Sequence, residues 1–312
     1  MTVLYIVVPC YNEEEVLKET ATRLKDKLRR MESAKTVAPE SKIMFVDDGS
    51  SDSTWQLIES LCEGDSTFRG VKLSRNRGHQ NALLAGLMTA KDFCDCAISM
   101  DADLQDDIEV LDKFIEKFNE GCDIVYGVRS SRTTDTGFKR ASAQAFYKLM
   151  KFFGVDIVYN HADYRLMSKR ALFSLEEFGE VNLFLRGIVP QIGYKTATVE
   201  YERGERFAGE SKYPLKKMLS FAFDGITSFS VKPIRFITAL GLVIFLVSLV
   251  ILVYSLVVNA IGNTVSGWTS TIMSVWLLGG LQLMAIGVIG EYVGKSYMES
   301  KRRPRYIIDK IL

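Results

Sequence analysis

A stretch of 55 residues without a charged residue or a histidine is the strongest constraint on the fold of this 312-residue chain. It runs from Phe236 to Gly290, although the sequence holds 39 basic and 38 acidic residues. Two apolar runs, Ile237–Val258 and Ile272–Val293, lie in this stretch except for the last three residues of the second, and each is about 22 residues long. As helices they would measure about 33 Å, close to the thickness of a bilayer core. We therefore expect a C-terminal hairpin of two transmembrane helices.

Basic residues flank both expected spans. Lys232 and Arg235 precede the first, and the second is followed by Lys295, Lys301, Arg302, Arg303, Arg305 and Lys310. The positive-inside rule then places both ends of the hairpin in the cytosol. Apolar residues at helical spacing within 213–235 indicate an interfacial amphipathic helix before the first span. Two buried helices of a soluble domain are the alternative, but 55 uncharged residues are hard to bury in a domain of this size.

Before this stretch, apolar β-rich runs alternate with helical patterns, as in a soluble α/β protein. The expected strands are Val3–Val8, Lys42–Val46, Val71–Leu73, Cys96–Met100 and Asp123–Tyr126. The expected helices are Glu13–Met31, one from Ser51 or Ser53 to about Cys62, Gln80–Thr89 and Ile108–Phe118. Such alternation predicts a mostly parallel, Rossmann-like sheet covered on both faces. The expected organisation is a cytosolic catalytic domain (1–212), an interfacial segment (213–235), two transmembrane helices (236–293) and a basic cytosolic tail (294–312).

Composition narrows the class of partner. The net charge is only +1, so no overall field attracts nucleic acid, and none is expected as a partner. The five cysteines form no CxxC pair, which argues against a disulfide framework and against a zinc site. The N-terminus has no basic region before its first apolar run, so no cleavable signal peptide is expected. The scattered cysteines favour a reducing, cytosolic setting, and the oligomeric state, including a homo-oligomer, stays open.

Polar motifs follow three of the expected strands. Asp101-Ala102-Asp103 comes directly after Cys96–Met100, where alternate carboxylates can enter a cleft and hold Mg²⁺ or Mn²⁺. Gln105 is available as a third oxygen ligand. A D-x-D sequence also arises by chance in a solvated turn, so its position after an apolar strand is the informative feature. Such a cation would stabilise charge on a leaving diphosphate.

The other two motifs are Pro9-Cys10-Tyr11-Asn12-Glu13 and Asp47-Asp48-Gly49-Ser50. Their carboxylates can accept hydrogen bonds from a ribose or a base, and Tyr11 can stack on the base. Each motif alone could be a turn with a helix cap. Ligands of parallel sheets bind at the carboxyl ends of strands, so three motifs at successive strand ends indicate one nucleotide site.

In this order, P-x-Y-N-E, D-D-G-S and D-A-D-L-Q resemble the inverting family 2 glycosyltransferases of GT-A fold. Ala208-Gly209-Glu210-Ser211-Lys212-Tyr213 and the two apolar spans resemble the polyprenyl-phosphate glycosyltransferases, such as bactoprenol glucosyltransferases and dolichol-phosphate mannose synthases. The resemblance covers essentially the whole chain. It implies transfer of a sugar from a nucleotide diphosphate to polyprenyl phosphate at the cytosolic face of the cytoplasmic membrane. UDP-glucose is the first choice of donor; GDP-mannose and UDP-amino sugars are the alternatives.

The resemblance also implies roles for individual residues. The positions that match nucleotide-sugar contacts are Pro9, Tyr11, Glu13, Asp48, Asp101, Ala102, Arg129 and Arg206, of which the arginines bind phosphate. Those that match the metal and diphosphate motif are Asp101 and Asp103, with Gln105 alongside. Asp163 matches the proposed catalytic base. Ser211, Lys212 and Arg165 are expected at the acceptor phosphate.

Chemistry qualifies the role of Asp163. A phosphate monoester has a second pKa near 6 and is largely dianionic at neutral pH, so it needs no base. Asp163 is therefore expected either to act as a base or to orient the acceptor and hold Arg165. His79, in the loop before an expected helix, is interpreted as structural, whereas its neighbour Gln80 is expected to touch the donor.

Three other functions share some of these sequence features. Processive polysaccharide synthases share the first motifs, but this chain lacks their Q-x-x-R-W motif and has fewer apolar spans. A transporter would need ionisable residues within its spans, and none is present in 236–290. A non-catalytic nucleotide-binding membrane scaffold stays open and would show no sugar transfer.

Overall fold

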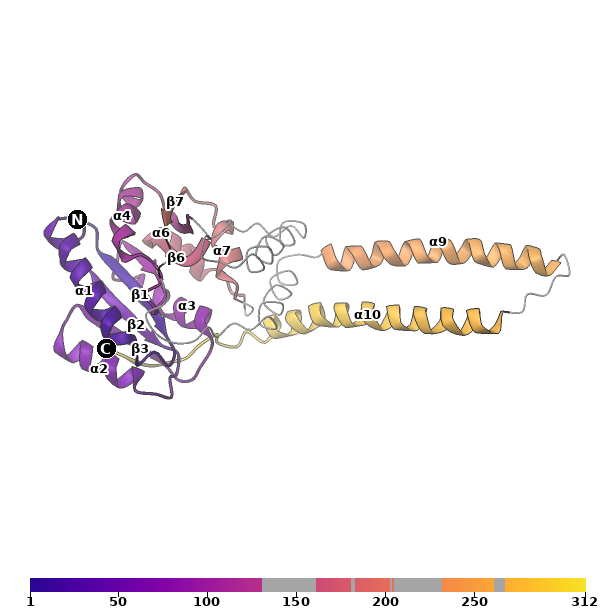
Figure 1. The fold of residues 1–312 in the computed structure, drawn as a ribbon, viewed down its shortest axis with the longest axis horizontal. Helices are drawn as coiled ribbons and strands as arrows, with labels where there is room; N and C mark the ends of the chain where they lie inside the picture. The colour runs from indigo at the N-terminus through magenta and orange to yellow at the C-terminus, as the bar shows by residue number, and fades with distance from the viewer. Residues whose placement is uncertain (131–160, 181–182, 203, 205–231, 261–266) are drawn as a thin grey trace.

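The computed structural model describes residues 1–130, 161–180, 183–202, 204, 232–260 and 267–312. One eight-stranded sheet forms the centre of the α/β domain, in the order β7-β5-β6-β4-β1-β2-β3-β8 (Figure 1). Its strands are β1 (Leu4–Cys10), β2 (Lys42–Asp47), β3 (Phe68–Leu73), β4 (Cys96–Ser99), β5 (Ile124–Arg129), β6 (His161–Ser168), β7 (Thr196–Tyr201) and β8 (Ile308–Ile311).

The helices are α1 (Leu17–Ser33), α2 (Thr54–Gly64), α3 (His79–Ala90), α4 (Leu111–Asn119), α6 (Lys169–Glu176), α7 (Leu185–Gln191), α9 (Lys232–Ala260) and α10 (Trp268–Ser300). A short 3₁₀ turn, Ile108–Val110, precedes α4. The five strands and four helices expected in residues 3–126 are all present, with ends that differ by a few residues. The prediction of a mostly parallel α/β domain is therefore confirmed.

Two apolar cores cover the two faces of the sheet. Successive side chains of a strand point to opposite faces, so Leu4, Ile6 and Val8 of β1 join the core with α1, α2 and α4. Tyr5 and Val7 join the core with α3, α6 and α7. Burial of both faces explains why the strands read as continuous apolar runs.

The order of the strands creates the position for a site. β1 pairs in parallel with β2 on one side and with β4 on the other. The chain order reverses between these neighbours, and in open α/β sheets ligands bind at such a point, outside the carboxyl ends of the strands. The motifs after β1, β2 and β4 therefore share one edge, as the sequence predicts.

The segment expected to be only a basic tail contributes a strand. β8 pairs antiparallel with β3, and the Lys310 ammonium lies 2.8 Å from the Glu59 carboxylate of α2. The Leu312 amide donates to the Gly70 carbonyl at 2.8 Å. The C-terminal strand thus lies at one edge of the sheet of the α/β domain, a pairing we did not predict.

Helices α9 and α10 cover the two apolar runs expected as spans. They extend away from the domain side by side, and α10 returns the chain towards the sheet (Figure 1). Within the part of the chain that the structure describes, no helix meets the length and apolarity needed to cross a membrane. The transmembrane expectation therefore finds no support there, and most of the interfacial segment, 213–231, lies outside the described residues.

Gly86 of α3 provides a test of this packing. A Cβ there would lie 2.4 Å from Val7 Cγ1 and 2.6 Å from Val46 Cγ2, in the core between α3 and the sheet. Because overpacking costs about 1–3 kcal/mol, we expect Gly86→Ala to lower the free energy of unfolding by about 2 kcal/mol in urea titrations. Gly64→Ala is the control, because no atom lies within 4 Å of its added Cβ. Equal stability of the two variants would contradict the close contact.

Candidate active site

The register of β4 and β6 brings Asp163 to the D-x-D motif. Ser99 of β4 pairs with Arg165 of the antiparallel β6, so Asp163 lies beyond the end of β4, where Asp101 follows. The Ser99 hydroxyl donates to the Asp163 carbonyl at 2.5 Å. The two carboxylates that the sequence separates by about 60 residues therefore meet at one edge of the sheet.

The loop after β4 has a strained backbone. Leu104 adopts a φ of +57°, in the left-handed region that costs a residue with a Cβ about 1–2 kcal/mol. The turn lets the Gln105 amide donate to the Asp103 carboxylate at 3.2 Å, and the Gln105 carbonyl accepts from Gly204 at 2.9 Å. Strain of this kind persists where the surroundings hold the loop, and it is common at functional sites.

Two arginines pair with Asp163. Arg165 Nη2 lies 2.6 Å from Asp163 Oδ1, and Arg186 of α7 reaches both oxygens, with Nε 3.3 Å from Oδ1 and Nη2 3.1 Å from Oδ2. Burial alone would raise the pKa of Asp163, but Arg186 and Arg165 hold it well below its usual value. A carboxylate so stabilised as an anion is a poor proton acceptor.

Asp101 shows the opposite shift. Burial raises the pKa of Asp101, and the Asp163 and Asp103 carboxylates raise it further, while His79 and Arg186 act against this. His79 Nε2 lies 3.5 Å from Asp101 Oδ1 and 3.8 Å from Asp163 Oδ2. His79, which we interpreted as structural, is thus positioned between the two carboxylates.

The loops after β1 and β2 hold each other. The Asn12 amide donates to Ser50 Oγ at 3.0 Å, and Asn12 Oδ1 accepts from the Ser51 amide at 2.9 Å. Asp48 is buried and accepts from the Arg77 and Gly78 amides at 2.7 and 2.8 Å. Both Asp48 oxygens therefore fix the loop before α3.

Other predicted donor residues surround these loops. Pro9 is buried in β1, Glu13 is half-buried, and Tyr11 is exposed at the strand end. Ala102 is buried, and its carbonyl accepts from Thr20 Oγ1 at 2.8 Å. Gly49, with a φ of +67°, is required because a Cβ there would lie 2.6 Å from the backbone of Arg75 and Asn76.

Asp106 connects the loop after β4 to the neighbouring strands. The Tyr201 hydroxyl of β7 donates to Asp106 Oδ1 at 2.6 Å, and Arg129 Nε of β5 donates to the same hydroxyl at 3.4 Å. Among the described residues, Asp106 Oδ2 is buried without a hydrogen-bond partner. Burial raises the pKa of Asp106 to about 6. The sequence did not identify Asp106 or Tyr201.

This raised pKa predicts a pH dependence of stability. The pKa of Asp106 is about 6 in the folded protein, against 3.8 for an ordinary Asp. The stability contributed by its protonated carboxyl is therefore fully present below pH 3.8 and is lost as the pH rises through 6. Asp106→Asn removes the titration. Between pH 5 and pH 7.5, in EDTA, we expect the variant to gain about 1.4 kcal/mol relative to wild type. If the free energies of unfolding of wild type and Asp106→Asn differ by the same amount at pH 5 and pH 7.5, the raised pKa of Asp106 is refuted.

Gln80, predicted to contact the sugar donor, and Arg165, predicted to contact the acceptor phosphate, both make hydrogen bonds within the protein. Gln80 Oε1 accepts from the Leu185 amide of α7 at 2.9 Å. The prediction that Arg165 meets the acceptor phosphate is at odds with its 1% exposure; its Nη1 instead donates to the Leu185 carbonyl at 3.3 Å. Arg206, Ser211 and Lys212 lie outside the described residues.

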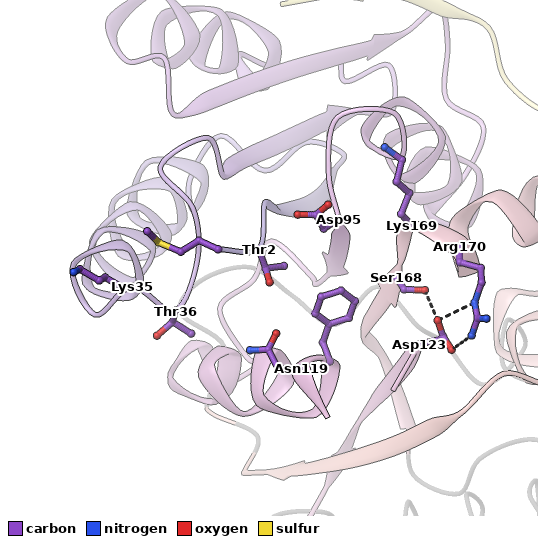
Figure 2. Close-up of a pocket in the computed structure, with 11 residues that line it drawn as sticks. Thr2, Lys35, Thr36, Asp95, Asn119, Asp123, Ser168, Lys169 and Arg170 are labelled. Atoms are coloured by element: carbon purple, nitrogen blue, oxygen red, sulfur yellow. Dashed lines mark hydrogen bonds and ion pairs between the residues drawn. The ribbon is translucent and has the colours of Figure 1, made fainter. Parts of the chain in front are cut away.

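A hollow of about 560 Å³ lies at the opposite edge of the sheet, around the residues before β4 and β5 (Figure 2). Asp123 there accepts from Ser168 Oγ at 2.9 Å and from Arg170 Nε at 3.2 Å. Asp95 accepts from the Val3 amide at 2.8 Å. These carboxylates hold strand ends together, far from the carboxyl ends of the parallel strands, so this hollow is not the site.

A divalent cation fits the D-x-D loop by its donor set. The described residues contain no group of three His, Cys, Asp or Glu arranged to hold a metal. Mg²⁺ is often bound by only one or two carboxylates, with substrate phosphates completing its shell. Asp101 has a raised pKa beside other carboxylates, so a cation here would relieve their repulsion.

Comparisons with known proteins identify the family of this chain. Residues 5–174 match the family described as glycosyl transferase family 2. An uncharacterized glycosyltransferase, YkoT of Bacillus subtilis, is 58% identical over 98% of this chain and 91% of its own. A prophage bactoprenol glucosyl transferase homolog of Escherichia coli is 41% identical over 98% of both chains, and the bactoprenol glucosyl transferase of Shigella phage SfV is 41% identical over 97% of both.

Among solved structures, a mannosyltransferase of Pyrobaculum calidifontis, in complex with GDP-Man and Mn²⁺, covers 94% of this chain and 87% of its own. Its identity is 14% and its TM-score is 0.48. This identity and TM-score are too low to indicate a shared substrate or metal.

Proposed function

The chain belongs to glycosyl transferase family 2 and is a glycosyltransferase, and we propose that it transfers glucose from UDP-glucose to undecaprenyl or another polyprenyl phosphate. The names of the bactoprenol glucosyl transferases, which match over nearly the whole chain, support the lipid phosphate and the glucose. The observation that carries the proposal is that Asp101 and Asp163 lie together, with His79 between them, at the edge where the motifs after β1 and β2 also lie. Arg186 pairs with the Asp163 carboxylate there.

The donor would lie across the ends of β1, β2 and β4. In this arrangement Tyr11 and Glu13 contact the nucleoside, while Asp48 shapes the pocket through the loop it holds. Asp101 and Asp103, with Gln105, would hold Mg²⁺ or Mn²⁺, which when bound offsets charge on the departing diphosphate. Arg129, Ala102 and Gln80 from this edge, and Arg206, complete the proposed donor site.

We further propose that the segment 236–293 lies in the cytoplasmic membrane, with the catalytic domain and both termini on the cytosolic side. The support is the charge-free sequence and its basic flanks. This support comes from the sequence alone, because none of the helices that the structure describes is long and apolar enough to cross a membrane. Apolar side chains on α9 such as Val243, Val250 and Val253 are exposed, a pattern unfavourable in water. An acceptor held in a bilayer would then enter the site near the headgroups.

The reaction would be a single displacement with inversion. A phosphate oxygen of the lipid attacks the anomeric carbon, the bond from that carbon to the diphosphate breaks, and UDP leaves. The acceptor is already an anion at neutral pH, so Asp163 need not remove a proton. Its pairing with Arg165 and Arg186 supports the alternative role, in which it holds these side chains.

A donor screen tests the proposal. Purified full-length protein, undecaprenyl phosphate and Mg²⁺ or Mn²⁺ are supplied with UDP-glucose, GDP-mannose or a UDP-amino sugar. We expect glucosyl lipid only with UDP-glucose, with its anomeric configuration inverted. If another donor is preferred, the transferred sugar is not glucose. If no donor gives a lipid product, the proposed transfer is rejected in favour of a non-catalytic scaffold.

A further inference from the structure

Arg186 lies outside every motif of the sequence, yet its side chain reaches the site. It contacts both Asp163 oxygens from α7, and 31% of its side chain is exposed, against 1% for Arg165 on the other side of the same carboxylate. Of the two arginines that hold Asp163, only Arg186 is accessible to a ligand.

The residue before Arg186 is held by hydrogen bonds to two other elements. The preceding residue, Leu185, donates its amide to Gln80 Oε1 of α3 at 2.9 Å, and its carbonyl accepts from Arg165 Nη1 of β6 at 3.3 Å. Two hydrogen bonds, one from α3 and one from β6, therefore fix the backbone next to Arg186. A side chain oriented in this way loses little conformational freedom when it binds a ligand.

An anion at this point would meet two guanidinium groups, because Asp163 pairs with both Arg165 and Arg186. The neighbouring Asp101 and Asp103 carboxylates, which would otherwise repel the anion, would be offset by the proposed divalent cation. A guanidinium is planar, presents several donors and matches the oxygens of phosphate. The accessible member of the cluster can donate to such an anion while Asp163 keeps it in place.

We propose that Arg186 binds the phosphate of the acceptor, and that Asp163, Arg165 and Gln80 are positioning residues that hold it. The inference rests on the proposed function, since it assigns a ligand to the same site. It takes over the role that the sequence gave to Arg165, whose guanidinium is buried.

Steady-state kinetics of the purified full-length protein test the proposal, with UDP-glucose and undecaprenyl phosphate varied separately. We expect Arg186→Gln to raise the KM for the lipid phosphate about tenfold or more, as expected for loss of a charge-assisted hydrogen bond, and to change the KM for UDP-glucose less than about threefold. Arg186→Lys keeps the charge and should recover part of the loss. Gln191→Ala, at the exposed end of the same helix, should match wild type.

The outcomes separate the two proposals. If wild type forms no glucosyl lipid, the proposed function fails. If wild type is active but Arg186→Gln leaves the KM for the lipid phosphate unchanged, or raises both KM values equally, the role of Arg186 is refuted. If Arg186→Gln does not fold, Arg186→Lys decides: a raised KM for the lipid phosphate at an unchanged melting temperature supports the role, and a wild-type KM overturns it.

Discussion

Replacing Asp103 by alanine is expected to reduce glucosyl transfer at least about a thousandfold. The residue supplies one of two carboxylates in a loop with a left-handed residue at Leu104, next to a neighbour, Asp101, whose pKa is raised by burial and by nearby carboxylates. Loss of Asp103 leaves one carboxylate to hold a divalent cation, and removing even one group that stabilises developing charge commonly costs about 10²–10³ in rate.

The measurement is transfer of labelled glucose to lipid, together with UDP binding by calorimetry with and without Mn²⁺. We expect UDP binding without metal to stay within a few-fold of wild type, while the tightening by Mn²⁺ is lost. Glu116→Ala, on the exposed face of α4, is the control for loss of a carboxylate and should be fully active. Normal transfer by Asp103→Ala would exclude this loop as the metal and diphosphate site.

Asp163→Asn is expected to lower both stability and turnover. Arg165 is 1% exposed, so neutralising its partner leaves a buried charge without compensation, a change that costs about 3–5 kcal/mol when a buried pair is broken. Turnover should fall as well, because Arg186 loses the partner that orients it. The pKa of Asp163 is held well below its usual value, so its stabilising effect is present above pH 4 and lost only as pH falls through that lower pKa. The loss should therefore be constant between pH 6 and pH 8.

Asp123→Asn is a matched control for the loss of stability. Asp123 and Asp163 are each 9% exposed, but the arginine paired with Asp123, Arg170, has a side chain that is 64% exposed. Water can solvate Arg170 when its partner is neutralised, so this variant should lose only about 1 kcal/mol. Equal losses in urea titrations would contradict the role of burial. Loss of turnover by Asp163→Asn with wild-type stability would instead favour a catalytic base.

Local pattern was sufficient for the first half of the fold. β1, β2 and β4 are buried on both faces, so they appear as apolar runs, and α1 carries an apolar stripe through Leu17, Leu24 and Leu28. The position of the motifs after these strands followed from the rule for parallel sheets. Local pattern fails for β6, His161–Ser168, which has Asp163 and Arg165 at its centre and is a strand only because it pairs with β4 and β5.

The missed parts of the site depend on contacts between distant segments. Arg186 follows no motif, and its role arises because β6 presents Asp163 to α7. His79 was interpreted as structural, since nothing local shows that α3 begins beside Asp101. Likewise β8 has four residues in a basic segment and pairs with a strand more than 200 positions earlier. The position of His79 after β3, at the same edge as the three motifs, is the one signal that could have suggested it.

An acceptor comparison is the most direct test of transfer to a lipid phosphate. The full-length protein with labelled UDP-glucose and Mn²⁺ is given undecaprenyl phosphate, undecaprenol or free glucose in parallel. We predict label only on undecaprenyl phosphate, as a glucosyl phosphate ester released by mild acid. Label on undecaprenol or free glucose, with none on the lipid phosphate, would contradict the proposed acceptor.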